Sequence, residues 1–187
     1  MSYYNTVTGE SYAYNDKAFM VAASTYKLPL NMYYYEMEKN GEIPSDAALS
    51  RTAYPLNEAH RLSLVWSDND VSIGMLYSLG DFRQYKECMR KYFTMPAEEI
   101  DYIYYVDNYY CTNMMMDALK YLFYNGEQFP EMLEYMKQAQ PGSYFRTYVK
   151  DWPVAHKYGY FEGAINDVGI FFTPEPFCLA VYTYGTD

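Results

Sequence analysis

The chain has 187 residues, of which 50% are apolar or aromatic, and it carries a formal net charge of -10 at pH 7. That length suits one domain with a buried core. The acidic balance argues against a nucleic-acid partner, because no basic patch is present to displace counterions from phosphates. No apolar run is long enough to span a membrane, and the opening residues do not form a signal peptide.

The three cysteines stand far apart and lack the Cys-x-x-Cys spacing of zinc sites. Their odd number also argues against a disulfide framework, since at least one thiol would be free in a monomer. The sequence therefore predicts neither a bound metal nor a cofactor.

The N-terminal residues Ser2 to Asn15 predict a β-hairpin with Gly9 in its turn. Ser24 is a good helix-start residue and Asn40-Gly41 is a good helix stop, so we expect one helix over residues 24–39. Apolar spacing and capping residues predict further helices over 56–66, 70–79, 82–93, 112–124 and 130–139. After Pro153 the pattern becomes that of strands, which are expected over 154–160, 164–173 and 177–184.

This order of strands, helices and strands predicts an α+β fold, with an antiparallel sheet formed by both ends of the chain. We expect a single domain over residues 1–187, with residues 1–23 and 153–187 in the sheet and 24–152 mostly helical. Residues 94–111 lack a clear period and hold a proline, acidic residues and several tyrosines, so we expect a long ordered loop over a cleft.

The first candidate site is the segment Ser24-Thr25-Tyr26-Lys27. Residues three positions apart share a helix face, so the Ser24 hydroxyl and the Lys27 amine can meet. A lysine buried among apolar neighbours can lose its charge and accept the serine proton, which turns the hydroxyl into a nucleophile. Because Ser-x-x-Lys is common by chance, the motif by itself favours a capping serine and a surface lysine over a catalytic pair.

Two further polar clusters follow along the chain. Ser67-Asp68-Asn69 separates two apolar helices, either as a simple capping break or to present a hydroxyl and an amide to a cleft. Lys157-Tyr158-Gly159 lies on the first C-terminal strand. The preceding His156 points to the opposite face of that strand and is expected to be structural.

In this order, the three clusters resemble the S-x-x-K, S-D-N and K-T-G signature of class A β-lactamases and penicillin-binding proteins. The first two motifs match in full, whereas the third has Tyr158 where threonine is usual. The resemblance extends over nearly the whole chain and implies the α+β fold of these serine enzymes.

The resemblance implies that Ser24 attacks a carbonyl and becomes acylated, with Lys27 as the base for that step. Ser67 would relay a proton to the departing nitrogen. The backbone N–H groups of Ser24 and Tyr160 would form the oxyanion hole, which stabilises the negative charge of the transition state.

The same resemblance implies four substrate-binding residues. Asn69 would hold the side-chain amide of the substrate, and Lys157 would attract its carboxylate. Gly159 would let the substrate lie against the strand. Tyr158 would crowd the carboxylate pocket, or would replace the hydrogen bond of the usual threonine from further away.

Class A β-lactamases use a loop glutamate, within a Glu-x-x-Leu-Asn pattern, to activate the water that releases the acyl group. In this chain the loop holds Glu98, Glu99, Asp101 and Asp107, and none of them stands in that pattern. The resemblance therefore implies slow deacylation.

The implied function is a serine hydrolase acting on β-lactams or D-alanyl cell-wall peptides outside the cytoplasmic membrane. There are two alternatives: a catalytically weakened cell-wall or surface binding module on the same fold, and a serine esterase or peptidase.

Relatives carry a helix at each end, whereas this sequence begins within the hairpin and stops at residues 185–187. We expect the exposed sheet face to be uncovered, paired in a homodimer, or covered by sequence outside this chain.

Overall fold

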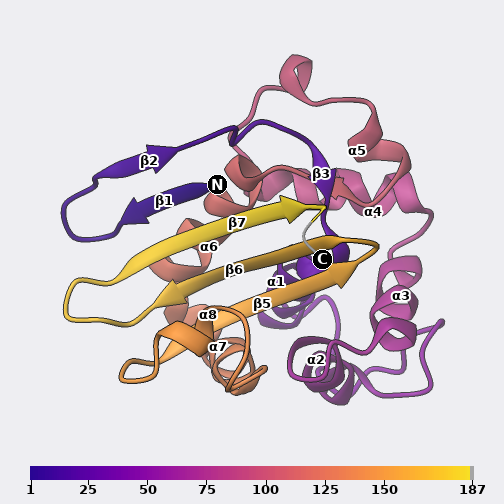
Figure 1. Ribbon diagram of the computed structural model, residues 1–187. Coiled ribbons are helices and arrows are strands. Elements are labelled where there is room, and N and C mark those ends of the chain that lie inside the picture. The colour runs from indigo at the N-terminus through magenta and orange to yellow at the C-terminus, as the bar shows by residue number, and fades with distance from the viewer. Residues whose placement is uncertain (186–187) are drawn as a thin grey trace.

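The computed structural model describes residues 1–185, and Thr186 and Asp187 at the end of the chain lie outside them. Both chain ends contribute to one antiparallel sheet with the strand order β2-β1-β7-β6-β5 (Figure 1). Its strands are β1 (Ser2–Asn5), β2 (Ser11–Ala13), β5 (Val154–Phe161), β6 (Ala164–Phe171) and β7 (Phe177–Tyr184). The predicted α+β class, the N-terminal hairpin and the three C-terminal strands are confirmed.

Helices fill the middle of the chain, as the sequence predicts. The longer ones are α1 (Lys27–Lys39), α2 (Leu56–Leu64), α3 (Asn69–Ser78), α4 (Phe82–Met89), α6 (Thr112–Tyr124) and α7 (Pro130–Gln138). Two single-turn helices, α5 (Ile103–Val106) and α8 (Phe145–Tyr148), were not expected from the sequence. Their four-residue lengths are too short to produce a visible apolar period.

The expected loop over residues 94–111 is ordered and is joined to the segment before α1. Strand β3 (Met20–Val21) pairs with β4 (Tyr109–Tyr110) in a second, two-stranded sheet. This pairing places the end of the loop beside the start of the first helical segment.

The start of that segment differs from the prediction. A 3-10 turn over Ala23–Tyr26 precedes α1, and the residue at its N-cap position is Ala22, without a side-chain cap. Ala23 has a φ of 49°, in the left-handed region that L-residues rarely adopt. The capping role predicted for Ser24 is therefore wrong, because the chain enters the helix through a sharp bend that leaves Ser24 within the turn.

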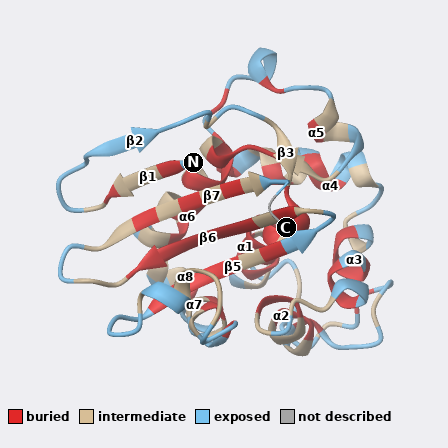
Figure 2. Ribbon diagram, in the orientation of Figure 1, coloured by how far each residue is buried: buried red, intermediate tan, exposed pale blue. Residues whose placement is uncertain are grey.

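Helices α1 and α6 lie behind the sheet in Figure 1, and the buried residues in Figure 2 concentrate along these helices and the central strands. On the near face, α8 lies against β5. Leu179 and Val181 of β7 are only half-buried. A homodimer through this sheet face stays a prediction. Among the described residues, no helix has the length and apolar character needed to cross a bilayer.

Candidate active site

Ser24 lies at the edge of a cavity of about 460 Å³. The wall includes residues of α3, the loop just before α6, and the end of β5. Three of the predicted site residues contribute to the lining: Ser24, Asn69 and Tyr160. The shared lining brings the nucleophile candidate and the residue expected to supply the second oxyanion-hole N–H to one space.

The turn that carries Ser24 is held by asparagine side chains. Asn108 Nδ2 donates to the Ala23 carbonyl at 2.9 Å, and its own carbonyl accepts from the Ala22 N–H at 2.8 Å. Asn166 Nδ2 donates to the Val21 carbonyl at 2.7 Å. No sequence motif singles out these two asparagines, since their partners are backbone atoms far away in the sequence.

Gly159 lets strand β5 approach this turn closely. A Cβ atom at this position would lie 2.7 Å from the Ser24 nitrogen and 3.0 Å from the Ala22 carbonyl oxygen. What the structure shows is that the missing side chain makes room for the turn at Ala23–Tyr26, whose backbone could not otherwise lie against the strand. The expectation that Gly159 also lets a substrate lie against the strand stays a prediction.

The Lys27 amine contacts the second motif. Its Nζ donates to the Ser67 carbonyl at 2.6 Å, to Asn69 Oδ1 at 2.8 Å, to Ser67 Oγ at 3.1 Å and to the Asp68 carbonyl at 3.2 Å. None of these four partners is Ser24, which lies one turn away: the Lys27 N–H bonds to the Ser24 carbonyl. Burial lowers the pKa of Lys27 to about 7, despite the opposing effect of Asp68.

The Ser67-Asp68-Asn69 segment combines both roles considered for it. Asp68 Oδ1 accepts the Val71 N–H at 2.9 Å and so caps α3. Ser67 has a φ of 55°, and its hydroxyl is turned toward the lysines while Asn69 is exposed at the cavity. The helix cap thus places Asn69 at the cavity, while the Ser67 hydroxyl accepts from Lys27 and Lys157.

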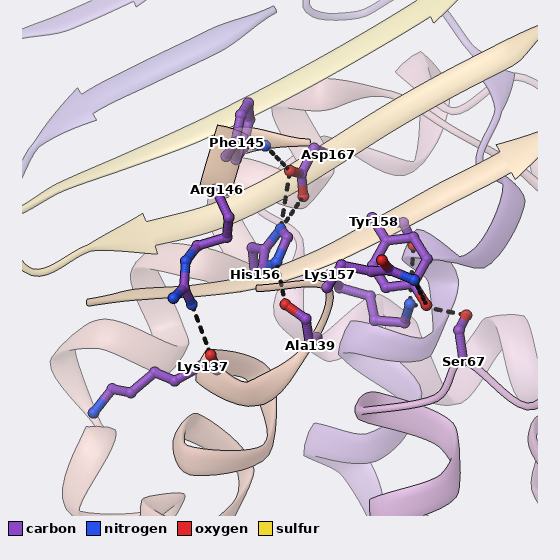
Figure 3. Close-up of polar contacts among 10 residues, drawn as sticks. Ser67, Lys137, Ala139, Phe145, Arg146, His156, Lys157, Tyr158 and Asp167 are labelled. Carbon is purple, nitrogen blue, oxygen red and sulfur yellow. Dashed lines mark hydrogen bonds and ion pairs between the residues drawn. The ribbon is translucent and has the colours of Figure 1, made fainter. Parts of the chain in front are cut away.

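Lys157 reaches the same hydroxyl from the sheet. Its Nζ donates to Ser67 Oγ and to the Tyr158 carbonyl, both at 2.9 Å, as Figure 3 shows. Lys157 is fully buried. Burial lowers its pKa well below the ordinary value, and the neighbouring Lys27 lowers it further. All three motifs therefore meet around Ser67, whose oxygen accepts from one amine on each side.

Tyr158 and Tyr160 have different surroundings. The Tyr158 ring stacks on that of Tyr144, with centroids 4.8 Å apart, and its hydroxyl accepts from Gln140 Nε2 at 3.3 Å. The Tyr160 side chain is 66% exposed at the rim of the cavity.

His156 takes part in a separate buried cluster. Its Nδ1 lies 2.9 Å from both carboxylate oxygens of Asp167, and its Nε2 donates to the Ala139 carbonyl at 2.8 Å (Figure 3). Asp167 Oδ2 also accepts the Phe145 N–H at 2.9 Å. These contacts join the segment after α7 to the sheet, which agrees with a structural role.

Of the four loop carboxylates expected near the site, Asp107 lines the cavity. Glu99 instead forms an ion pair with Lys17 at 2.5 Å on the surface.

Lys86, a buried lysine beneath the loop, was not predicted from the sequence, because it belongs to no motif. Its Nζ donates to the Tyr109 carbonyl at 3.2 Å and lies 3.7 Å from the centroid of the Tyr110 ring. Burial lowers the pKa of Lys86 well below its ordinary value.

Within residues 1–185, no three histidine, cysteine, aspartate or glutamate side chains come together as a metal site would require. The described site brings together a hydroxyl, two amines of lowered pKa and an amide beside a cavity.

The sequence matches the model of a protein family described as the beta-lactamase enzyme family over residues 1–187. Solved structures of similar fold include the class A beta-lactamase of the last common ancestor of Gram-negative bacteria, with 16% identity and a TM-score of 0.83, covering 100% of this chain and 84% of that chain. A beta-lactamase from Xanthomonas campestris pv. campestris has 16% identity and a TM-score of 0.83, with coverages of 98% and 82%. PBP-A has 14% identity and a TM-score of 0.83, with coverages of 99% and 80%. No curated protein matches the sequence significantly.

Proposed function

The chain belongs to the beta-lactamase enzyme family, and on that premise we propose that it is a serine hydrolase whose Ser24 is acylated by β-lactams or D-alanyl cell-wall peptides. The observation that carries this proposal is the convergence of Lys27 and Lys157 on Ser67 Oγ, beside the cavity that Ser24 lines. This arrangement supplies a nucleophile, a base and a proton relay within one site.

Lys27 acts as the base, because its pKa of about 7 leaves much of the amine neutral at physiological pH. The Ser24 proton passes to the Lys27 amine as Oγ bonds to the carbonyl carbon. A hydrogen bond between a nucleophile and its base, here Ser24 Oγ and Lys27 Nζ, often forms or tightens only when substrate is bound. The C–N bond of the lactam or peptide then breaks, and the proton reaches the departing nitrogen through Ser67, which lies next to both lysines.

The oxyanion is held by the backbone N–H groups of Ser24 and Tyr160. Removing one such donor typically costs about 3 kcal/mol of transition-state stabilisation. Asn69, exposed at the cavity, holds the amide of the acyl side chain.

Deacylation is slow in this proposal. The loop offers Asp107 at the cavity, but this carboxylate is exposed to solvent and is not buried toward the acyl group. A carboxylate in contact with solvent has no fixed position from which to activate the deacylating water. The acyl-enzyme should therefore accumulate.

Intact-protein mass spectrometry after incubation with benzylpenicillin tests the proposal. We expect a mass increase equal to one penicillin, located at Ser24 by peptide mapping, with little colour change from a chromogenic cephalosporin. Ser24→Ala should remove the adduct, while the exposed Ser45→Ala should leave it in place. Rapid colour development would contradict slow deacylation, and labelling of Ser24→Ala would contradict the assignment of the nucleophile.

The buried state of Lys157 favours one second candidate, a cell-wall binding module that keeps the cleft without turnover. In that case no acyl donor would label Ser24. For either function we propose a location outside the cytoplasmic membrane, where the substrates of this family occur.

A further inference from the structure

The geometry points to a substrate class for this site: acyl donors that have an apolar acyl group and no free carboxylate, with Tyr158 as the residue that excludes a carboxylate from Lys157. This inference rests on the proposed acylation of Ser24. Of the donors named there, it makes those with a free carboxylate, such as penicillins and D-alanyl peptides, slower acyl donors than their esters. Three separate features of the described residues support it.

The first feature is the complete burial of the Lys157 amine. The residue has no exposed surface, and its Nζ lies 4.0 Å from the centroid of the Tyr158 ring. Its two hydrogen bonds go to Ser67 Oγ and the Tyr158 carbonyl. A substrate carboxylate could reach this amine only if the Tyr158 ring moved. Burial also lowers the pKa of Lys157 well below its ordinary value, which acts against the charged form that would attract an anion.

The second feature is the support of Tyr158 from outside. Tyr144 stacks on its ring at an interplanar angle of 29°, and Gln140 donates to its hydroxyl. Gln140 and Tyr144 both have positive φ values, of 40° and 54°. The next residue, Phe145, is tied to the sheet through its N–H bond to Asp167. Because L-residues adopt such backbone only when their surroundings determine it, this segment holds Tyr158 over Lys157 in a defined position.

The third feature is the lining of the cavity. Within the part of the chain that the structure describes, no lysine or arginine contributes to the lining, but Asp107 and Glu162 do. An anionic substrate would therefore meet two carboxylates and no exposed cation in a protein of net charge -10.

Apolar and aromatic side chains form much of the remaining wall. Ile73, Leu76 and Tyr77 of α3 face this space together with Phe82 and Phe161. Apolar walls with few polar groups favour an apolar or aromatic acyl substituent, since its transfer from water is favourable.

Benzylpenicillin and its methyl ester test this inference, because the two share an aromatic acyl group and differ in the free carboxylate. For each compound, the rate of adduct formation at Ser24 is followed by intact-protein mass spectrometry. In the native protein we expect the ester to react at least about tenfold faster, a ratio that corresponds to 1.4 kcal/mol.

Tyr158→Thr should raise the rate for the free acid by about tenfold and leave the ester rate nearly unchanged, because it uncovers Lys157. The exposed strand tyrosine provides a matched control: Tyr12→Thr should change neither rate. If the Tyr158→Thr protein does not fold, the ratio of the acylation rates for the acid and the ester in the native protein still tests the inference.

Equal rates for the two compounds in the native protein, or a faster free acid, would overturn this inference while leaving acylation of Ser24 established. A different result would overturn the proposed function itself: no adduct at Ser24 from the acid, from the ester or from an activated aromatic ester such as p-nitrophenyl phenylacetate. The two failures are therefore distinguishable.

Discussion

Adjacent residues of strand β5, His156 and Lys157, are both fully buried but lie in opposite kinds of polar surroundings (Figure 3). His156 lies between a carboxylate and a carbonyl, so each ring nitrogen has a hydrogen-bond partner that accepts. Lys157 instead donates to a hydroxyl and a carbonyl, and within residues 1–185 no carboxylate is among its hydrogen-bond partners.

The imbalance around Lys157 extends to Lys27, since the two amines share Ser67 Oγ. Burying an amine without a hydrogen-bonded anion favours its neutral form, whereas buried hydrogen bonds to a carboxylate hold chain segments together. Strand β5 therefore carries a structural cluster on one face. On its other face, which we call the lysine face, Lys157 and Lys27 share the Ser67 hydroxyl.

Removal of the Lys27 amine should have the largest effect. Lys27→Met should lower the rate of Ser24 acylation by about 10²- to 10⁴-fold, the usual contribution of a general base. Stability should not fall much, because the variant also removes a costly buried amine. Stopped-flow acylation and urea unfolding measure the two effects. Lys39→Met, at the exposed end of the same helix, is the control, and native-like acylation by Lys27→Met would exclude Lys27 as the base.

On the His156 face of strand β5 we expect the opposite, a loss of stability. Asp167→Ala should lower the free energy of unfolding by about 3 kcal/mol, because it leaves His156 and the Phe145 N–H without their buried acceptor. Urea unfolding monitored by circular dichroism measures the loss, with the exposed Asp151→Ala as control. A native midpoint for Asp167→Ala would show that the cluster does not stabilise the fold.

Disturbing the contact of strand β5 with the Ser24 turn should slow acylation less than the loss of the Lys27 amine. Gly159→Ala should slow acylation by about 10²-fold, because its Cβ would lie 2.7 Å from the Ser24 nitrogen and must displace the turn. Gly142→Ala is the matched control, since a Cβ there meets no atom within 4 Å. If both variants acylate at the native rate, the close approach of β5 does not position Ser24.

Much of the fold could be predicted from the sequence, because caps and apolar periods are local signals. The helix over 112–124 begins and ends as predicted, and the three C-terminal strands form. The 3-10 turn at Ser24 could not be predicted, because it depends on asparagine side chains and on Gly159 from distant segments.

The motif residues of the candidate site could also be found in the sequence, but their surroundings could not. The pairing of His156 with Asp167 depends on the register between β5 and β6, which places Gly169 directly opposite His156. Lys86 has no motif around it, and its burial follows from the way aromatic residues of the loop enclose it. Such contacts join side chains far apart along the chain and leave no local pattern.

The dependence of acylation on pH is the smallest of the expected effects and addresses the lysine face alone. With a pKa of about 7, the neutral fraction of Lys27 is about one tenth at pH 6 and nine tenths at pH 8. Acylation by an uncharged donor, such as the methyl ester of benzylpenicillin, should therefore rise roughly tenfold over this interval. The residual rate of Lys27→Met should stay flat.

Protein stability should change in the same direction. The pKa of Lys27 is lower in the folded protein than the ordinary value of 10.5, so between these values the unfolded chain binds more protons. Lys27 therefore makes the free energy of unfolding rise from about pH 7 toward pH 10.5, and Lys157 acts with the same sign. Urea unfolding at several pH values measures this slope, which should be reduced in Lys27→Met. An acylation rate that falls between pH 6 and 8 would mean that the protonated amine is the active form, and the lysine face would then lack its base.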